Sequence, residues 1–291
     1  MRAEQSEARQ AHLRGAIAIV GAGNWGSSLA AGVASAGMAL REVVVRRAKD
    51  RRRRFGTTSV VLIGQARLDA EVIWICVPDG EIGGVAAQIA ERRGDLRGQL
   101  VVHSSGALTI EALEAAQRAG AAVGSVAPVF SFPTREPVGL GGVLFAVEAS
   151  SERVRRKLNS LVRSLGGTPL RVDLASKVMY HAAATMASPL MVSAVHAGVE
   201  MARHAGLEQS DAEAVVGVLA MSTLRNYFEK GSERSFSGAF ARGDAGTVEL
   251  HLRALLKHPR LHKVYLELAR HAVGALTVQN RVELERVLGE P

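Results

Sequence analysis

Residues 16–26 read AIAIVGAGNWG, an apolar run that passes directly into the spacing G-x-G-x-x-G. In this spacing the first glycine permits a tight turn, the second lets the backbone approach a pyrophosphate, and the third lets the next helix pack against the strand. A helix is predicted to follow at once, so that its N-terminus faces the phosphates. A glycine-rich turn of another α/β fold is the alternative. We expect a dinucleotide-binding turn made of Gly21, Ala22, Gly23, Asn24, Trp25 and Gly26.

The end of the second predicted strand, residues 42–45, indicates which dinucleotide is bound. NAD-binding proteins usually place Asp or Glu about twenty residues after the glycine motif, where it bonds the ribose 2′-hydroxyl. Here Arg46 and Arg47 occupy that place. A guanidinium pairs with a 2′-phosphate, whereas a carboxylate would repel it. We therefore predict NADP(H) as the cofactor. The alternative is that the basic residues form the solvent-exposed start of a helix, and this interpretation fits residues 51–54 better.

The rest of the N-terminal half alternates between apolar strands and helices, the pattern typical of a doubly wound parallel sheet. Residue 173 ends this alternation, and helical periodicity dominates the remainder. The fold class expected is therefore an α/β Rossmann domain followed by an all-α C-terminal domain. The predicted boundaries are a flexible N-terminus over 1–14, an NADP-binding Rossmann domain over 15–174, and a helical substrate or dimerisation domain over 175–291.

The amino-acid composition limits which partners the protein is expected to bind and in which cellular compartment it is expected to be found. The 291 residues carry a formal net charge of +8, much of it from residues 46–54, and no aromatic residue interleaves with that basic run to stack on bases. This weighs against nucleic-acid binding, which stays a third possibility. The single cysteine, Cys76, cannot form an internal disulfide and is expected to be a small buried side chain. With no apolar leader and no stretch that suggests a membrane span, a cytoplasmic location is expected.

Two predicted strands end in polar loops. In open α/β sheets, ligands bind at the carboxyl ends of the strands, so these loops are candidate site segments. The second of these loops, residues 103–106, is explained equally well as a hydrogen-bonded turn that takes no part in binding or catalysis. The cofactor is expected to contact Val77, Pro78, Asp79 and Ser104, and the substrate His103 and Ser105.

Four segments resemble a bacterial family of Rossmann-like proteins with a domain of unknown function 2520. They are VHSSGAL at 102–108, GSVAP at 124–128, YHAA at 180–183, and SGAFARGD at 237–244, which is followed by Thr247 and His251. That family is akin to pyrroline-carboxylate reductases and deazaflavin-dependent NADP oxidoreductases, and the resemblance extends over about residues 17–265. It implies NADP-linked oxidoreduction and an α-helical C-terminal domain that dimerises.

The sequence departs from that family in two places. The family tends to show His-Pro after the Gly-Ser pair, and this chain has Ala127-Pro128. It tends to show an Asn in the long helix, where this chain has Ser188-Pro189. If either missing group helps to bind substrate, the activity here is altered or lost.

Hydride transfer to a carbonyl or imine needs a proton donor near the reacting heteroatom. Lys177 and His181 are four residues apart and share one helical face. Related hydroxyacid dehydrogenases place a lysine on this helix, pointing into the interdomain cleft, and by that likeness Lys177 or His181 would be the donor. The alternative is that neither is a proton donor: Lys177 is a surface lysine, and His181 is a histidine packed beside it.

A second candidate cluster lies at 242–251. Asp244, Thr247 and His251 are spaced i, i+3 and i+7, again one helical face. Arg242 is expected to bind a substrate carboxylate, Asp244 to contact substrate or cap the helix, and His251 to take part in catalysis. No short-range ligand pair accompanies the histidines, so no metal is expected.

Together these patterns predict an NADPH-dependent reductase of a small oxo acid or cyclic imine, with the substrate in the interdomain cleft. An alternative of another class is left open: the chain binds NADP(H) without catalysis and signals through its helical domain. The partners expected are a small-molecule substrate and a second copy bound through the helical domain. Neither the substrate nor the direction of reaction follows from the sequence.

Overall fold

The computed structural model describes residues 15–47, 49–50 and 55–289. The N-terminus predicted over 1–14, and the basic residues 51–54, lie outside the described residues. The chain divides into two compact units, one ending at Thr185 and the other beginning at Met186.

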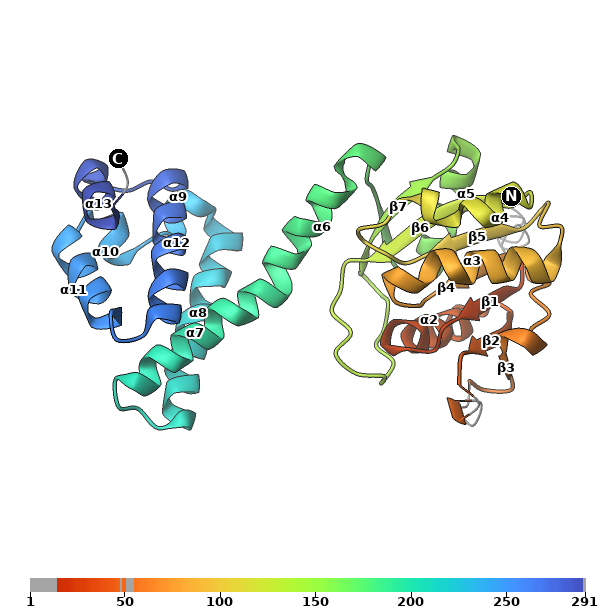
Figure 1. The fold of residues 1–291 in the computed structure, drawn as a ribbon, viewed down its shortest axis with the longest axis horizontal. Coiled ribbons are helices and arrows are strands. Elements are labelled where there is room, and N and C mark those ends of the chain that lie inside the picture. Colours follow the sequence, from red (N-terminus) through yellow and green to blue (C-terminus); the bar gives the residue numbers. More distant parts are fainter. Residues whose placement is uncertain (1–14, 48, 51–54, 290–291) are drawn as a thin grey trace, which may run out of the picture. The chain divides into compact units, whose positions relative to one another are not determined.

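The first unit is built on one eight-stranded sheet, with the order β3-β2-β1-β4-β5-β6-β7-β8 (Figure 1). All neighbouring strands run parallel except β6 and β7. The order reverses beside β1, which makes the crevice between β1 and β4 the expected ligand site. The strands are β1 (Ile17–Val20), β2 (Leu40–Val45), β3 (Ser59–Leu62), β4 (Val72–Ile75), β5 (Leu100–His103), β6 (Ala122–Pro128), β7 (Leu144–Ala149) and β8 (Thr168–Arg171).

Helices cover both faces of this sheet, as its almost wholly apolar strands require. On one face, side chains of α2 and α5 pack on Trp74 and Phe145. On the other face, side chains of α3 and the turn before α4 pack on Ile73 and Ile75. Successive residues of β4 thus enter opposite cores, because side chains alternate along a strand. The helices are α2 (Asn24–Ser35), α3 (Asp79–Arg93), α4 (Glu114–Arg118) and α5 (Glu152–Ser164).

The long helical run predicted after residue 173 is present but interrupted. A 3₁₀ turn (Leu174–Ser176) leads into α6 (Lys177–Thr185), a π-helical segment covers Met186–Leu190, and α7 (Met191–His204) follows. Pro189 lies in the π-helical segment. A proline cannot donate the backbone hydrogen bond of a regular α-helix, and a wider turn accommodates this loss.

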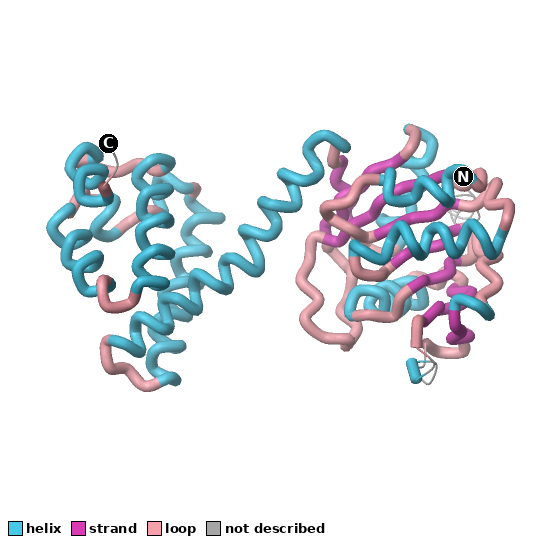
Figure 2. The backbone as a smooth tube through the Cα atoms, viewed as in Figure 1, coloured by secondary structure: helices cyan, strands magenta, loops and turns pink. Residues whose placement is uncertain are grey.

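The second unit is all-helical (Figure 2). Two small cores hold it together, one around Val248 and Val273 and another around Ala197 and Leu261. Its last helix is not predicted by the periodicity of the sequence. Its elements after α7 are α8 (Gln209–Lys230), α9 (Ser232–Ser235), α10 (Gly238–Ala241), α11 (Ala245–Leu255), α12 (Pro259–Ala275) and α13 (Arg281–Leu288).

One helical run has the length and composition of a membrane span. It is the segment Lys177–His204, with a hydropathy of 1.3 in its most apolar window. A single helix of this kind is weak support for a membrane span, and α7 in this run packs against α8. The predicted Rossmann fold with an all-helical second part is confirmed.

Candidate functional site

The glycine-rich turn has the geometry that its spacing predicts. Gly21 has a φ of +107°, and a Cβ there would lie 2.3 Å from the carbonyl oxygen of Cys76. A Cβ on Gly26 would lie 2.0 Å from the carbonyl oxygen of Gly21. A Cβ on Gly23 would meet no atom within 4 Å in the part of the chain that the structure describes. Two glycines are therefore required by the packing of the turn itself, and the third leaves the space in front of the helix open.

The N-terminus of α2 is oriented for an anion. Gly23 is the N-cap and offers no side chain to the first backbone N–H groups. These groups carry the positive end of the helix dipole, which favours a phosphate. The Asn24 side chain instead donates from Nδ2 to the carbonyl oxygen of Phe132, at 2.8 Å. The backbone, rather than the side chain of Asn24, is thus the part of this turn that faces a ligand.

Ser104 joins the glycine turn to the sheet. Its hydroxyl accepts hydrogen bonds from the indole Nε1–H of Trp25, at 2.7 Å, and of Trp74, at 2.8 Å. The two indole rings meet edge to face, with centroids 6.4 Å apart. The residue was predicted to contact the cofactor. In the structure, its hydroxyl oxygen holds the start of α2 against β4.

A pocket of about 410 Å³ opens beside Gly21 at the carboxyl ends of β1 and β2. This volume is within the range of small-molecule sites. Its wall is mostly apolar, and its charged residues are Arg46 and Glu81, which pair across 2.5 Å. The lining residues are Val20, Gly21, Val44, Val45, Arg46, Ile63, Val77, Glu81, Gly84, Val85 and Gln88.

The two arginines predicted to bind a 2′-phosphate follow β2 at this edge. Arg46 lines the pocket, with 73% of its side chain exposed. Arg47 donates from Nε to the carboxylate of Asp50, at 3.0 Å. The Arg47 guanidinium holds the pKa of Asp50 below its usual range. Both guanidinium groups therefore pair with a carboxylate near the place where a 2′-phosphate is expected.

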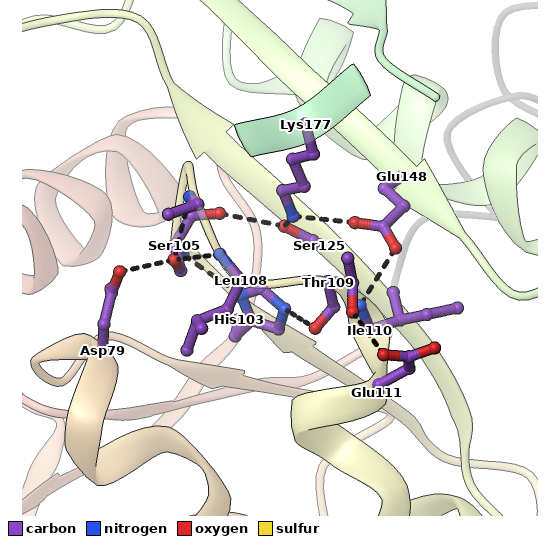
Figure 3. A network of polar contacts seen from close by, with 11 residues as sticks. Asp79, His103, Ser105, Leu108, Thr109, Ile110, Glu111, Ser125, Glu148 and Lys177 are labelled. Atoms are coloured by element: carbon purple, nitrogen blue, oxygen red, sulfur yellow. Dashed lines mark hydrogen bonds and ion pairs between the residues drawn. The ribbon is translucent and has the colours of Figure 1, made fainter. Parts of the chain in front are cut away.

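A buried polar network lies at the carboxyl end of β5 and on the adjoining parts of β6 and β7 (Figure 3). The Lys177 ammonium donates to the hydroxyl of Ser125 and to the carboxylate of Glu148, both at 2.7 Å. The second carboxylate oxygen of Glu148 accepts from the backbone N–H of Ile110. Lys177 is 1% exposed and Glu148 4%. Burial lowers the pKa of Lys177, and the bond to Glu148 opposes that shift.

His103 belongs to the same network. Its Nδ1 accepts from the backbone N–H of Ser105, at 3.1 Å, so its Nε2 carries the proton that bonds the carbonyl oxygen of Thr109. Burial, and to a smaller extent the positive charge of Lys177, lowers the pKa of His103 to about 4. The ring is thus neutral and holds the loop that follows β5.

Ser105 ties that loop to α3. Its hydroxyl donates to the carboxylate of Asp79, at 2.7 Å, and accepts from the backbone N–H groups of Ala107 and Leu108. Pro78 is the N-cap of α3, where its fixed φ suits the start of a helix. The predicted site residues Pro78, Asp79 and Ser105 therefore come together at one sheet edge.

His181 lies beside this network without entering it. A Cβ on Gly106 would lie 2.6 Å from the Nδ1 atom of His181, so the imidazole packs directly on that glycine. The ring is half-buried. Among the described hydrogen bonds and ion pairs, His181 has none, whereas the Lys177 ammonium has two acceptors. The geometry therefore counts against Lys177 as a proton donor and leaves His181 as the better-placed of the two.

The remaining predicted residues lie in the second unit. Asp244 caps α11, accepting from the backbone N–H and the hydroxyl of Thr247. Its role as an N-cap, one of the two expected, is observed. His251 shares a hydrogen bond of 2.8 Å with the phenol of Tyr265, and Arg242 is exposed. Burial raises the pKa of Tyr265 to about 12, so this phenol is neutral.

Sequence reasoning missed Ser125 and Glu148 of the buried network, Glu81 of the pocket and, in the second unit, Tyr265. Glu148 carried a detectable signal, because a carboxylate within the apolar strand LFAVEA must find a partner. Glu81 and Tyr265 carried none, since each is an ordinary residue of an amphipathic helix. The described residues contain no group of three or more His, Cys, Asp or Glu that could hold a metal ion.

These features define a Rossmann-like fold with a strand-end site. We use this name for the glycine-rich turn, its pocket and the buried polar network, which lie where the strands of the sheet end. Residues 1–128 match the model of the Rossmann-like domain, and residues 143–272 match the model named Domain of unknown function (DUF2520). The resemblance seen in the sequence is thereby confirmed, since the two parts of the chain match these two models. The comparison with curated proteins gave no match.

Solved structures share the fold at low identity. A protein of Bacteroides fragilis assigned as an NADP oxidoreductase is 20% identical, with a TM-score of 0.71 over 88% of this chain and 96% of that one. Pyrroline carboxylate reductase of Plasmodium falciparum, solved with NADP, is 15% identical, with a TM-score of 0.58 over 95% and 98%. A reductive aminase of Aspergillus terreus, solved with NADPH and ethyl-5-oxohexanoate, is 13% identical, with a TM-score of 0.65 over 94% and 99%.

Proposed function

We propose that this protein is an NADP(H)-dependent oxidoreductase that reduces a small oxo acid or an imine. The observation that carries the proposal is the open glycine-rich turn, followed at once by α2 and bordered by a pocket with Arg46 at its edge. Solved structures of the same fold include an enzyme with NADP and another with NADPH and an oxo ester. These relatives support the class of reaction.

The residues present fit this cofactor. The backbone at Gly23 and the N-terminus of α2 would hold the pyrophosphate, because no atom of the described residues lies within 4 Å of a Cβ placed on Gly23. Val44, Ile63 and Val85 would line the adenosine end. Arg46 and Arg47 would pair with the 2′-phosphate. When bound, NADPH supplies the hydride for reduction.

The protein itself must supply a proton to the substrate oxygen or nitrogen. We assign this role to His181, whose imidazole lies on Gly106 at the carboxyl end of β5 with no polar partner among the described contacts. An imidazolium N–H can donate a proton to the substrate and take one back from solvent afterwards. Lys177 then acts as a positioning residue, since it connects the start of α6 with Ser125 and Glu148. In the second unit, Arg242 remains the candidate for a substrate carboxylate and His251 for a role in catalysis.

We also propose a homodimer formed through the helical unit. Large apolar side chains are exposed along α7 and α8, including Val192, Val218 and Leu219, which are 68%, 70% and 62% exposed. Where such side chains form a patch on a protein in water, the patch marks an interaction site. A second copy would cover it, and a cytoplasmic location is part of this proposal.

A non-catalytic NADP(H) sensor is the second candidate function. It is favoured by Ala127, which stands where related sequences tend to carry a histidine, and by the burial of Lys177 in an ion pair. Both candidates bind NADP(H), so only turnover separates them. A nucleic-acid function would instead show a steep dependence of binding on salt.

The test is calorimetric titration of the full chain with NADPH and with NADH. We expect preferential NADPH binding, and a loss of about tenfold or more in NADPH affinity in Arg46→Ala, since one charge-assisted bond to the phosphate disappears. Arg97→Ala is the matched control, because Arg97 is an exposed arginine of the same unit that pairs with the neighbouring Asp95. Absence of binding to either dinucleotide would refute the proposal.

Turnover is then measured with oxo acids alone and with oxo acids plus amines, by following NADPH absorbance. His181→Gln is expected to lower kcat about 100-fold while leaving the affinity for NADPH unchanged, as for the loss of a general acid. NADPH binding without turnover of any carbonyl or imine tested would favour the sensor.

A further inference from the structure

The segment between β6 and β7 runs beside the glycine-rich turn. Residues 129–142 lie between the two regions that match family models. The carbonyl oxygen of Phe132 accepts from the Asn24 side chain, and the Phe132 and Trp25 rings have centroids 5.0 Å apart. Farther along, the backbone N–H of Val138 donates to the hydroxyl of Ser28. Contacts at two successive turns of α2 thus hold this segment along the helix that faces the pyrophosphate.

Between those two contacts the segment presents Arg135 to the loop after β2. The Nη1 atom of Arg135 lies 3.9 Å from Oδ1 of Asp50. The other carboxylate oxygen, Oδ2, accepts from Nε of Arg47. Asp50 is 18% exposed, whereas the Arg47 and Arg135 side chains are about half exposed, at 50% and 53%. The largely enclosed carboxylate of Asp50 therefore lies between the guanidinium groups of Arg47 and Arg135, which belong to segments far apart in the sequence.

This arrangement indicates an anion site. Two guanidinium groups repel each other unless an anion lies between them, and here the carboxylate of Asp50 fills that role. The same two charges lower the pKa of Asp50. Arg47 directly follows Arg46 at the end of β2, the place from which a dinucleotide-binding sheet contacts the 2′ position of the adenosine ribose. A phosphate in this place would offer the two arginines more acceptor oxygens and more negative charge than one carboxylate.

We propose that Arg135 and Arg47 together bind the 2′-phosphate of NADP(H), and that Asp50 holds the two arginines in place while no cofactor is bound. The inference rests on the proposed function and adds a specificity-determining residue from the β6–β7 segment to it. Preference for NADP(H) over NAD(H) then depends on a segment that also contacts the glycine turn through Phe132. Binding at the 2′ position and binding at the pyrophosphate are thereby connected through one loop.

The decisive experiment titrates Arg135→Ala, in the full chain, with NADPH and with NADH. We expect about a tenfold loss of affinity for NADPH and no change for NADH, because only the former carries the 2′-phosphate. The fragments 2′,5′-ADP and 5′-AMP should show the same contrast. Arg97→Ala is again the control and should change neither affinity.

Asp50→Asn supplies an independent readout. The amide keeps the shape of the side chain but removes the charge that competes with the phosphate, so the affinity for NADPH should rise about threefold and that for NADH should stay constant. Circular dichroism of each variant checks that the fold is retained.

The outcomes separate this inference from the function on which it rests. If the wild-type chain prefers NADPH and Arg135→Ala keeps the full preference, or loses both dinucleotides equally, the role of Arg135 is refuted and the proposed function stands. If the wild-type chain binds neither dinucleotide, both the role of Arg135 and the proposed function are refuted.

Discussion

Individual side chains of the strand-end site act through a few hydrogen bonds whose partners are fixed by burial. His103 is fully buried, with both ring nitrogens engaged, and Ser104 accepts from two indole groups at once. Removing one partner of a buried hydrogen bond leaves the other unsatisfied, which costs about 1–3 kcal/mol for each group. Such residues affect stability first and ligand binding only through the loops that they hold.

Ser104→Ala should therefore destabilise the first unit. The substitution removes the only described acceptor of the Trp25 and Trp74 indole N–H groups, and we expect a loss of about 2–4 kcal/mol in the free energy of unfolding. Urea unfolding followed by tryptophan fluorescence measures it directly, because these are the two tryptophans of the chain. Ser222→Ala, on an exposed helix of the second unit, is the control. An unchanged midpoint would show that these bonds contribute nothing.

The pH dependence of stability should carry a contribution from His103. Its folded-state pKa of about 4 lies below the ordinary value of 6.5, so the unfolded chain takes up a proton first as the pH falls. Stability is complete above pH 6.5 and is lost progressively down to pH 4, by up to about 3 kcal/mol. Urea unfolding between pH 4 and pH 7 should show this slope in the wild-type chain and a shallower one in His103→Gln. Equal slopes would contradict the assignment.

At the scale of secondary-structure elements, the ion pair between Lys177 and Glu148 joins the start of α6 to β7. Each charge is almost completely removed from water, so each depends on the other. Breaking a buried pair by removing one partner costs about 3–5 kcal/mol, whereas replacing both by apolar groups is often tolerated. The network also reaches the loop after β5, through Ser125 and the backbone N–H of Ile110.

A double-mutant cycle tests this connection. Lys177→Met and Glu148→Leu should each lower the free energy of unfolding by about 3–5 kcal/mol, and the double variant should lose less than the sum. If His181 is the proton donor, the double variant should retain the pH profile of kcat/KM while its KM rises. A change in that profile would return Lys177 to the role of proton donor.

At the scale of the whole molecule, the exposed apolar surface of α7 and α8 is the feature that the described contacts leave unexplained. Both helices belong to the second unit, where α7 packs on α8 while Val192 and Val218 remain exposed. Burying such a surface against a second copy contributes about 25 cal/mol per Å² of apolar area and so favours association.

We predict that the chain sediments as a dimer and that Val218→Glu, combined with Leu219→Glu, shifts it to the monomer. The introduced charges would be desolvated in the interface, which is strongly unfavourable. Analytical ultracentrifugation at several concentrations measures the shift, and Glu213→Gln, on the same helix, is the control. A wild-type monomer at all concentrations would contradict the dimer.

Much of the fold was predictable from local pattern. An apolar run followed by the glycine spacing can form few structures, because Gly21 needs its positive φ and Gly26 tolerates no Cβ. The two parts of the chain likewise differ in periodicity, and strand-helix alternation favours a parallel sheet. The π-helical segment at Pro189 and the last helix, Arg281–Leu288, were not foreseen, because their stability depends on packing rather than on local sequence signals.

The candidate site was predictable only in its location. Strand ends of a parallel sheet meet at one edge, and so Asp79 and Ser105 were expected near each other. The partners of individual side chains were decided by the tertiary structure. Lys177 meets Ser125 and Glu148, and Asp50 meets Arg135, because the sheet order brings together residues that are distant along the chain. Sequence spacing identifies groups capable of chemistry, but only the folded chain establishes which of them are already paired.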